Sequence, residues 1–541
     1  MFATTIKKSM AMKRLLPLGL AAMGALLSAS AQAAAPGITG PAFNLVASPA
    51  YITQPDGQSV YSWGYGCNGT PSGYAPSAIT GTFCNAMQLP GPTLIVTEGQ
   101  VVTVTLTNNL PPAAGNTSIL FPGFTLSSPC PAGQQGLLTC EALPGGTVTY
   151  TFTAGSPGTR AYYSGTQGDL QVEMGLYGAI IVLPSSPVSN DSSTACTDSL
   201  APMGQNAAAR SNWGEGDFRL STSAYDHPAT CYDREYLFQF SEMDPSIHIA
   251  AAAQVAAGAK SLNVPTEPYH PAYFMINGRS MPDDMDRNYA PMYPNQPYNG
   301  NPHMHPGEIT LLRIIGQGRW QHPFHEHANH VRILARDGNL ILTPDNAQLA
   351  GPLMFTTTTT PGQAMDGLFY YTGKGLNWDL YGHNPASADA NAKLTCTPDT
   401  NGYNTGAPTA INYFEWCQDH NKPMQAAPFG DVASGGPVTL PDPNILLNGA
   451  WYGGSPYLGP DATARATFGK CTGVNNTTSC GTAGTTPPSG TVANSPSGEA
   501  GFAFMWHSHN EREITTNNIF PGGMLMMMLV DSREFVIDES L

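Results

Sequence analysis

The amino-acid sequence predicts an all-β protein made of β-sandwiches. Gly and Pro are frequent, with 58 and 48 copies among 541 residues, whereas charged residues make up only 11%. Short apolar runs alternate with these turn-forming residues, and long amphipathic helices are hard to find, which is typical of sandwiches and barrels. The hydrophobic fraction of 41% is that of a folded protein, and the length supports two or three separate cores.

The N-terminal segment has the pattern of a secretory signal. Four cations within residues 7–14 precede the apolar run 15–27, and the small residues of Ala31-Gln32-Ala33 follow. This order predicts a signal peptide over residues 1–33. The apolar run is shorter than the roughly 20 residues that span a bilayer, and no later stretch is longer. We therefore expect a mature chain without a transmembrane segment, exported to the periplasm, the cell surface or the extracellular space.

Cysteine usage and charge agree with export. The ten cysteines fall in five close pairs: Cys67/Cys84, Cys130/Cys140, Cys196/Cys231, Cys396/Cys417 and Cys471/Cys480. An even count in an exported chain favours disulfides, although spacing alone does not fix the connectivity. The net charge of −16 repels nucleic acid and anionic membranes, so neither is an expected partner.

Strand-like runs in the first third of the chain predict one sandwich over residues 34–184. These runs are 93–96, 101–106, 147–152 and 179–182. The segment before them is rich in Gly, Pro, Ser and Tyr, so it is expected to be ordered but irregular. Residues 185–232 are polar and carry two cysteines, which predicts a linker tied down by a disulfide.

A second predicted sandwich combines residues 233–372 with 498–541. Most of its strand-like runs precede residue 372. The runs 498–506 and 524–530 are predicted to supply the last strands of this sandwich. We expect 365–371 and 498–506 to be neighbours in one sheet. The intervening 373–497 is then an insertion stapled by cysteine pairs, because a structureless loop of that length is uncommon. The alternative is a third domain at about 440–541.

Histidines gather in two short stretches. Six of the 13 histidines lie in 322–330, His-Pro-Phe-His-Glu-His-Ala-Asn-His, and in 507–509, His-Ser-His. Residues two apart on a strand point to the same face, so each His-x-His pair can direct both rings to one metal-sized volume. An isolated His-x-His is more often a pair of surface histidines. Two such stretches in one chain favour a metal site.

The context of these stretches is specific. His-Pro-x-His-x-His is followed by a strand and Asp337-Gly338, and the late His-x-His precedes the apolar run 524–530. This order resembles the multicopper oxidase family of cupredoxin proteins, and 90–100 and 175–182 resemble the strands that open and close its first domain. The resemblance implies tandem cupredoxin-like Greek-key β-sandwiches, the second with a long disulfide-stapled insertion.

The resemblance also implies that several copper ligands are missing. In the family, four histidine motifs build a three-copper cluster, and a cysteine-based copper supplies its electrons. The first two motifs fall at four positions without histidine: Leu120, Pro122, Tyr163 and Gly165. The other two survive in five histidines: His322, His325, His327, His507 and His509.

The blue copper position has changed as well. Ser508 stands where the family has its cysteine, and Glu513 stands where it has the second histidine of that centre. Blue copper sites require a thiolate ligand, which a serine hydroxyl cannot replace. The resemblance therefore implies neither a blue copper centre nor a complete three-copper cluster.

What remains predicts a reduced metal site. Its expected ligands are His325, His327, His507 and His509, with His322 and Glu513 as weaker candidates. Four nitrogen ligands suit copper, so we expect copper in fewer than four ions, with another transition metal as the alternative. The competing interpretation is a decayed site whose histidines hydrogen-bond each other and the backbone.

The expected function follows from this site. The chain is predicted to be an exported multicopper-oxidase-like protein, acting as an oxidoreductase on metal ions or phenolic donors. Its partners would be such a small donor or an extracellular or periplasmic redox protein. The alternative is a catalytically inactive metal-binding or scaffold protein of the cell exterior.

A further His-x-His, formed by His303 and His305, precedes a predicted strand in a loop rich in Met, Pro and Tyr. We expect these histidines to lie in an exposed loop. The alternative is a copper(I)-delivery surface, because thioethers select that ion.

Overall fold

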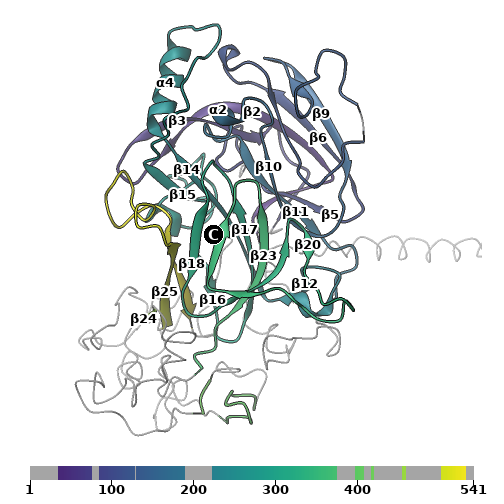
Figure 1. Ribbon diagram of the computed structural model, residues 1–541, viewed down its shortest axis with the longest axis vertical. Helices are drawn as coiled ribbons and strands as arrows, with labels where there is room; N and C mark the ends of the chain where they lie inside the picture. Colours follow the sequence, from purple (N-terminus) through teal and green to yellow (C-terminus); the bar gives the residue numbers. More distant parts are fainter. Residues whose placement is uncertain are drawn as a thin grey trace, which may run out of the picture.

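Strands dominate the computed structural model, which confirms the all-β class (Figure 1). The structure describes residues 35–75, 84–127, 129–188, 222–374, 397–406, 416–418, 454–457 and 501–531. The α-helices in these ranges are α2 (Gly168–Gln171) and α4 (Pro245–Ala256). Neither is long and apolar enough to cross a membrane. The predicted signal peptide lies outside the described residues.

The first domain is a two-sheet sandwich. One sheet has the order β3 (Ser59–Cys67), β2 (Ala42–Thr53), β6 (Val101–Asn108) and β9 (Thr147–Thr153). The other has the order β10 (Gly158–Tyr163), β11 (Tyr177–Leu183), β5 (Leu94–Thr97), β1 (Gly37–Thr39) and β4 (Tyr74–Ala75). The small strands β7 (Thr117–Ser118) and β8 (Glu141–Ala142) and the 3-10 turn η1 (Pro112–Ala114) complete this domain.

The pattern of buried side chains along each strand of this domain depends on whether one or both faces of the strand are covered. In β6 every second residue is buried, because only one of its faces meets the core. All of β11 is buried, because its second face packs against residues of the second domain such as Leu237 and Ile315.

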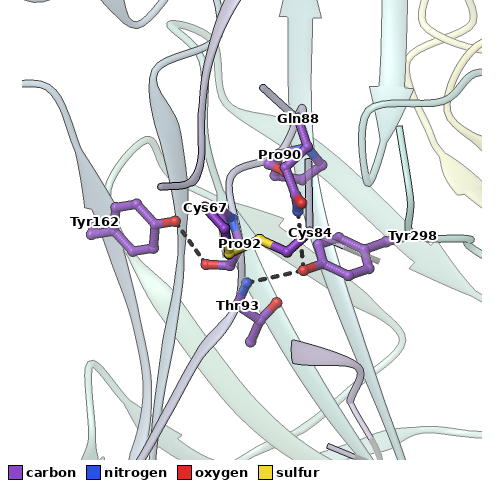
Figure 2. Close-up of a disulfide and its surroundings, with 8 residues drawn as sticks. All are labelled: Cys67, Cys84, Gln88, Pro90, Pro92, Thr93, Tyr162 and Tyr298. Atoms are coloured by element: carbon purple, nitrogen blue, oxygen red, sulfur yellow. Dashed lines mark hydrogen bonds between the residues drawn. A yellow bond between two sulfur atoms is a disulfide. The ribbon is translucent and has the colours of Figure 1, made fainter. Parts of the chain in front are cut away.

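Two of the predicted disulfides are present, Cys67–Cys84 and Cys130–Cys140. The first lies close to the junction of the two domains (Figure 2). There the Tyr298 hydroxyl of the second domain accepts hydrogen bonds from the Thr93 amide (3.1 Å) and the Gln88 side chain (3.2 Å). Cys231 and Cys417 are also disulfide-bonded. The remaining cysteines, Cys196, Cys396, Cys471 and Cys480, lie outside the described residues.

The second domain is also a two-sheet sandwich. Its first sheet has the order β15 (Tyr273–Ile276), β14 (Arg234–Met243), β17 (Ile309–Gly316), β23 (Ala364–Tyr370), β19 (Val331–Arg336) and β20 (Asn339–Leu340), with β21 (Leu353–Met354) on β19. Its second has the order β16 (His303–Met304), β26 (Leu525–Asp531), β25 (Gly501–Ser508), β18 (His322–Glu326) and β22 (Thr356–Thr359), with β24 (Gly454–Tyr457) on β25. The 3-10 turn η3 (Asp283–Met285) contacts β26.

One predicted strand pairing is wrong. β23 and β25 were expected to be neighbours in one sheet, but they lie in opposite sheets of the second sandwich. Their side chains meet across the core, where the ring centroids of Phe369 and Trp506 are 4.9 Å apart. An apolar pattern specifies which face of a strand is buried but not which sheet the strand joins. Apolar side chains of 236–371 and 504–530 nevertheless share one core.

Two predicted connecting segments contribute to this domain. β24 lies within the predicted insertion and extends the second sheet by pairing with β25. The end of the predicted linker forms a small hairpin of β12 (Thr222–Ser223) and β13 (Cys231–Tyr232), joined through η2 (Pro228–Thr230). Tyr225 in this hairpin is buried against the first sheet. The domain boundaries themselves stay a prediction.

A buried polar network joins the two domains. Arg313 pairs with Glu235 inside the second domain, and its Nη1 donates to Thr159 Oγ1 of the first domain at 2.9 Å. Asp366 accepts a hydrogen bond from the Thr159 amide at 3.1 Å and another from the Tyr225 hydroxyl. Arg313 lies between the two carboxylates, with its Nη1 3.5 Å from Asp366, so opposite charges face each other at the domain junction. In Figure 1 the purple and blue first domain accordingly lies directly against the teal and green second domain.

Candidate metal centre

The two histidine stretches lie on neighbouring strands. β18 and β25 pair antiparallel with His325 directly opposite His507. Residues directly opposite each other share one face of the sheet, so both rings point away from the core. The residues beside them, Phe324 and Trp506, point inward and are fully buried. Strict alternation therefore positions the two histidines.

His327 and His509 follow these strands and complete a group of four imidazoles. His327 is held by its backbone, because its carbonyl accepts a hydrogen bond from the buried Trp506 indole at 3.0 Å. The His509 amide donates to the Pro323 carbonyl at 2.8 Å, which ties it to the start of β18. We call His325, His327, His507 and His509 the four-histidine cluster.

The rings of the cluster are in mutual contact. The centroid of His325 lies 4.8 Å from that of His327, 5.6 Å from that of His507 and 5.0 Å from that of His509. The Nε2 atoms of His327 and His507 are 3.2 Å apart. Two nitrogens at that separation, each about 2.0–2.1 Å from one ion, would subtend about 100° there, close to tetrahedral.

The whole cluster is not yet arranged as a coordination shell. No three His, Cys, Asp or Glu groups within the described ranges already surround an ion-sized position. Most of the ring pairs meet edge to face, with interplanar angles such as 76° between His325 and His327. Metal binding therefore requires these rings to rotate on a backbone that already brings them together.

Hydrogen bonds orient two of the rings. The Nδ1 atom of His507 donates to the Ser508 carbonyl at 2.8 Å, so its Nε2 carries the lone pair. The Nδ1 atom of His325 lies 2.8 Å from the Thr356 hydroxyl, which orients this ring. Such partners on the second nitrogen are typical of metal-binding histidines.

Two of the rings, His325 and His507, are also held uncharged. Burial and the neighbouring imidazoles His327, His507 and His509 lower the pKa of His325 to about 4. Burial likewise lowers the pKa of His507. Neutral imidazole is the form that binds metal. The cluster is open on one side, where His509 is exposed and Phe355, which is 47% exposed, packs against His325.

Glu326 lies on the opposite face of β18 and does not join the cluster. Its side chain is fully buried and accepts a hydrogen bond from the Thr357 hydroxyl at 2.7 Å. Burial raises the pKa of Glu326 to about 8. The carboxyl is therefore protonated in the folded protein at neutral pH, whereas it ionises in the unfolded chain.

Replacing Glu326 with Gln is expected to stabilise the metal-free protein at pH 8. Between about pH 4.5 and 8 the native state keeps a proton that the unfolded state releases, so wild-type stability falls over this range. An amide does not titrate, and the gain at pH 8 should be roughly 2–4 kcal/mol, vanishing towards pH 4.5. Urea unfolding at both pH values measures it. Equal stability of the two proteins at pH 8 would contradict the expectation.

His322 and Glu513, the weaker predicted ligands, lie in a separate ion-pair network. Nδ1 of His322 is 2.9 Å from Glu513 Oε2, and its Nε2 is 2.9 Å from Glu242 Oε2. Burial alone would lower the pKa of His322, but the hydrogen bonds and charges of both carboxylates outweigh it and raise the pKa to about 9. Both nitrogens are thus occupied by carboxylates, so neither side chain supplies a ligand to the cluster as the structure stands.

The positions of the two lost histidine motifs lie together in the first domain. Leu120 and Tyr163 pair through their backbones, with N···O distances of 2.7 and 3.3 Å. A side chain added at Gly165 would meet the Leu120 side chain at 2.7 Å. These neighbours are apolar or phenolic, so they supply no imidazole.

The expectation of an exposed loop at His303 and His305 is wrong. His303 is part of β16, which pairs with β26, and His305 is fully buried. The His305 amide donates to Glu308 at 2.8 Å. Nothing in the sequence pointed to Glu242 or Thr356, because an acid in an apolar strand and a Thr in a run of five carry no signal for partners more than thirty residues away.

Comparison with known proteins supports the cupredoxin interpretation. A family model described as multicopper oxidase matches residues 74–187. An L-ascorbate oxidase from Brassica rapa subsp. pekinensis is 41% identical over 96 residues, which are 18% of this chain and 16% of that protein. Laccase abr2 from Aspergillus fumigatus is 34% identical over 117 residues, 21% of this chain and 18% of that protein. The chain therefore matches less than a fifth of either relative.

Solved structures give more extended but weaker matches. The multicopper oxidase mgLAC aligns over 92% of this chain and 87% of its own, with 13% identity and a TM-score of 0.43. A blue copper oxidase from Nitrosomonas europaea aligns over 90% and 85%, with 15% identity and a TM-score of 0.43.

Fold and histidine motifs together define a cupredoxin-like protein of tandem β-sandwiches. Residues 74–187 match the multicopper oxidase model, and the resemblance of the chain to the multicopper oxidase family is confirmed. That family implies copper as cofactor. The four-histidine cluster fits a copper ion, because it offers imidazole nitrogen donors, of which His325 and His507 have lowered pKa values. The network of Ser508, Glu513 and His322 does not fit blue copper, because it contains no thiolate.

Proposed function

We propose that this protein is an exported multicopper-oxidase-like protein that binds one copper ion through His325, His327, His507 and His509. It acts as an oxidoreductase on metal ions or phenolic donors. The observation that supports this proposal is the contact of four imidazoles, of which His325 and His507 have lowered pKa values. Nitrogen donors of this kind suit copper, with zinc or iron as weaker competitors.

The residues of the cluster have distinct roles in this proposal. Bound copper would supply one-electron exchange with a donor. His325 and His507, fixed by Thr356 and the Ser508 carbonyl, hold the buried side of the site. His509 lies on the open side, where the exposed Phe355 offers an apolar edge to an aromatic donor. Without a thiolate and the other histidine motifs, four-electron reduction of oxygen is not expected.

The second candidate is a catalytically inactive metal-binding or scaffold protein of the cell exterior. It is favoured by the lost motifs at Leu120 and Tyr163 and by the closed ion-pair network at the blue copper position. Metal content of protein purified from the exterior fraction, followed by assay of phenol and metal-ion oxidation, separates the two. Bound copper without turnover of any donor supports the second candidate.

Changing His509 to Ala is expected to weaken copper(II) binding by more than about 100-fold. Partners outside the coordination shell already contribute roughly 10–100-fold to metal affinity, and this change removes a ligand. Chelator competition at neutral pH measures the affinity, which should also fade below about pH 6 as imidazoles protonate. His303→Ala serves as the control and should leave affinity unchanged. Wild-type protein that stays metal-free after copper exposure would contradict the proposed function.

A further inference from the structure

A buried hydrogen-bond network connects the two histidine stretches behind the four-histidine cluster. Glu513 Oε2 accepts from His322 Nδ1 at 2.9 Å and from the Ser508 hydroxyl. His322 begins β18, which carries His325, and Ser508 stands between His507 and His509. Glu513 therefore joins both stretches through a single carboxylate oxygen.

The members of this network are enclosed. His322, Ser508 and Glu513 are each no more than 1% exposed. The second oxygen of Glu513 accepts a hydrogen bond from the Asn510 side chain at 2.9 Å. The backbone amide of Asn510 donates to Ser508 Oγ at 3.3 Å. These bonds close the turn from 508 to 513, and His509 lies in this turn.

The network is anchored on its other side by Glu242. Its Oε2 bonds His322 Nε2 at 2.9 Å, and its Oε1 accepts from the backbone amides of Arg319 (2.7 Å) and Trp320 (2.8 Å). A side chain at Gly318, where φ is +69°, would lie 2.6 Å from this carboxylate. The loop that leads into β18 is thereby built around Glu242.

Regular sheet pairing does not extend to all four ligands. The β18–β25 ladder includes His325 and His507 but ends before His327 and His509. The His509 amide bonds the Pro323 carbonyl, so its position depends on the start of β18, which His322 anchors. The position of His509 outside the ladder thus depends on this network, whereas the His327 backbone is held by the Trp506 indole.

We propose that Ser508, Glu513 and His322 are positioning residues that preorganise the four-histidine cluster for metal. This inference rests on the proposed function for the metal but assigns a separate role to residues that do not touch it. Where a thiolate-bound copper would couple the two stretches, a carboxylate shared by a hydroxyl and an imidazole couples them here. The network fixes the backbone, and only ring rotations remain when a metal enters.

The test compares metal binding in Ser508→Ala, Glu513→Gln and the double variant with that of the full-length wild type. Zinc(II) and copper(II) are the probes, and affinity is measured by chelator competition well below the unfolding temperature. Each single variant should bind roughly 10-fold more weakly or worse, the range typical of groups that orient ligands. Because both act through one network, the double variant should lose less than the product of the two single losses.

A matched control is available in the other sheet of the same domain. Asp366 is also a buried carboxylate, bonded to Thr159, Tyr225 and Arg313. Asp366→Asn should lower stability and leave metal affinity unchanged. The electron paramagnetic resonance spectrum of copper(II) adds a second readout, since Glu513→Gln should broaden it through mixed ligand geometries whereas Asp366→Asn should not.

The outcomes distinguish the two proposals. Wild-type protein that binds neither ion refutes the proposed function and, with it, this inference. Wild-type binding together with folded Ser508→Ala and Glu513→Gln variants of unchanged affinity refutes the positioning role alone. Equal affinity losses in Asp366→Asn would also refute it, because the effect would then be one of general stability.

Discussion

Replacing Ser508 with Cys and Glu513 with His together is expected to create a blue copper centre. Copper(II) added to this double variant should give an intense visible band from sulfur-to-copper charge transfer, which is not expected of the wild type. Ser508, Glu513 and His322 already converge, because one oxygen of Glu513 bonds both other side chains. A cysteine and two histidines in that arrangement form the ligand set of such centres.

The environment of His322 favours this conversion. Once Glu513 is replaced, Nδ1 of His322 loses its carboxylate partner and becomes free for copper. Its Nε2 still bonds Glu242, and a carboxylate on the second nitrogen orients a ligating imidazole and increases its basicity. The buried Met524 follows in the chain, and its carbonyl accepts from the Ser508 amide at 2.9 Å. Its thioether is therefore a candidate for the weak axial ligand.

The single variants are the controls. Ser508→Cys alone keeps the Glu513 carboxylate on His322 and should give at most a weak band. Glu513→His alone has no thiolate and should give none. Thiol titration before copper addition must show one reactive thiol in the two cysteine variants. A folded double variant that binds copper at this position without the band would show that the three side chains do not share a coordination volume.

The sequence predicted the fold and the cluster because both depend on short-range patterns. Alternating apolar residues mark strands, and two histidines two apart on a strand share a face whatever the rest of the chain does. His325 and His327 follow this rule, as do His507 and His509, with ring centroids 4.8 and 5.5 Å apart. The strands that lead into these pairs lie side by side. The predicted ligands His322 and Glu513 were placed by the family motif, which does not specify what an altered residue contacts.

The features that the sequence did not predict, the partner of His322 and the sheet that each strand joins, depend on contacts between distant parts of the chain. Glu242 lies on a strand eighty residues earlier and bonds His322. His322, which was predicted to be a weaker metal ligand, is therefore a buried cation in the structure. Nothing in Arg234–Met243 marks that carboxylate, because a buried acid in an apolar strand has no local signature. The same holds for β23 and β25, whose apolar faces meet across the core from opposite sheets.

The charge on His322 makes protein stability depend on pH in a defined direction. Its pKa is about 9 in the folded protein, against about 6.5 in an unfolded chain. Below pH 6.5 both states hold the proton and the full stabilisation is present. Between pH 6.5 and 9 only the native state holds it, so stability is lost as the pH rises. The expected loss is about 3 kcal/mol, because one pKa unit corresponds to roughly 1.4 kcal/mol.

Changing His322 to Gln should remove this pH dependence and lower stability at neutral pH. Gln carries no charge, so Glu242 and Glu513 are left buried without a cation, which typically costs about 3–5 kcal/mol. Urea unfolding of both metal-free proteins from pH 6 to 10 measures the effect. Glu326 titrates in the same direction, but it is common to both proteins and cancels in their difference. The difference in unfolding free energy between wild type and His322→Gln should be largest near pH 6. It should become small above pH 9, where wild-type His322 is neutral. A difference that stays constant across this range would mean that His322 is uncharged in the folded protein.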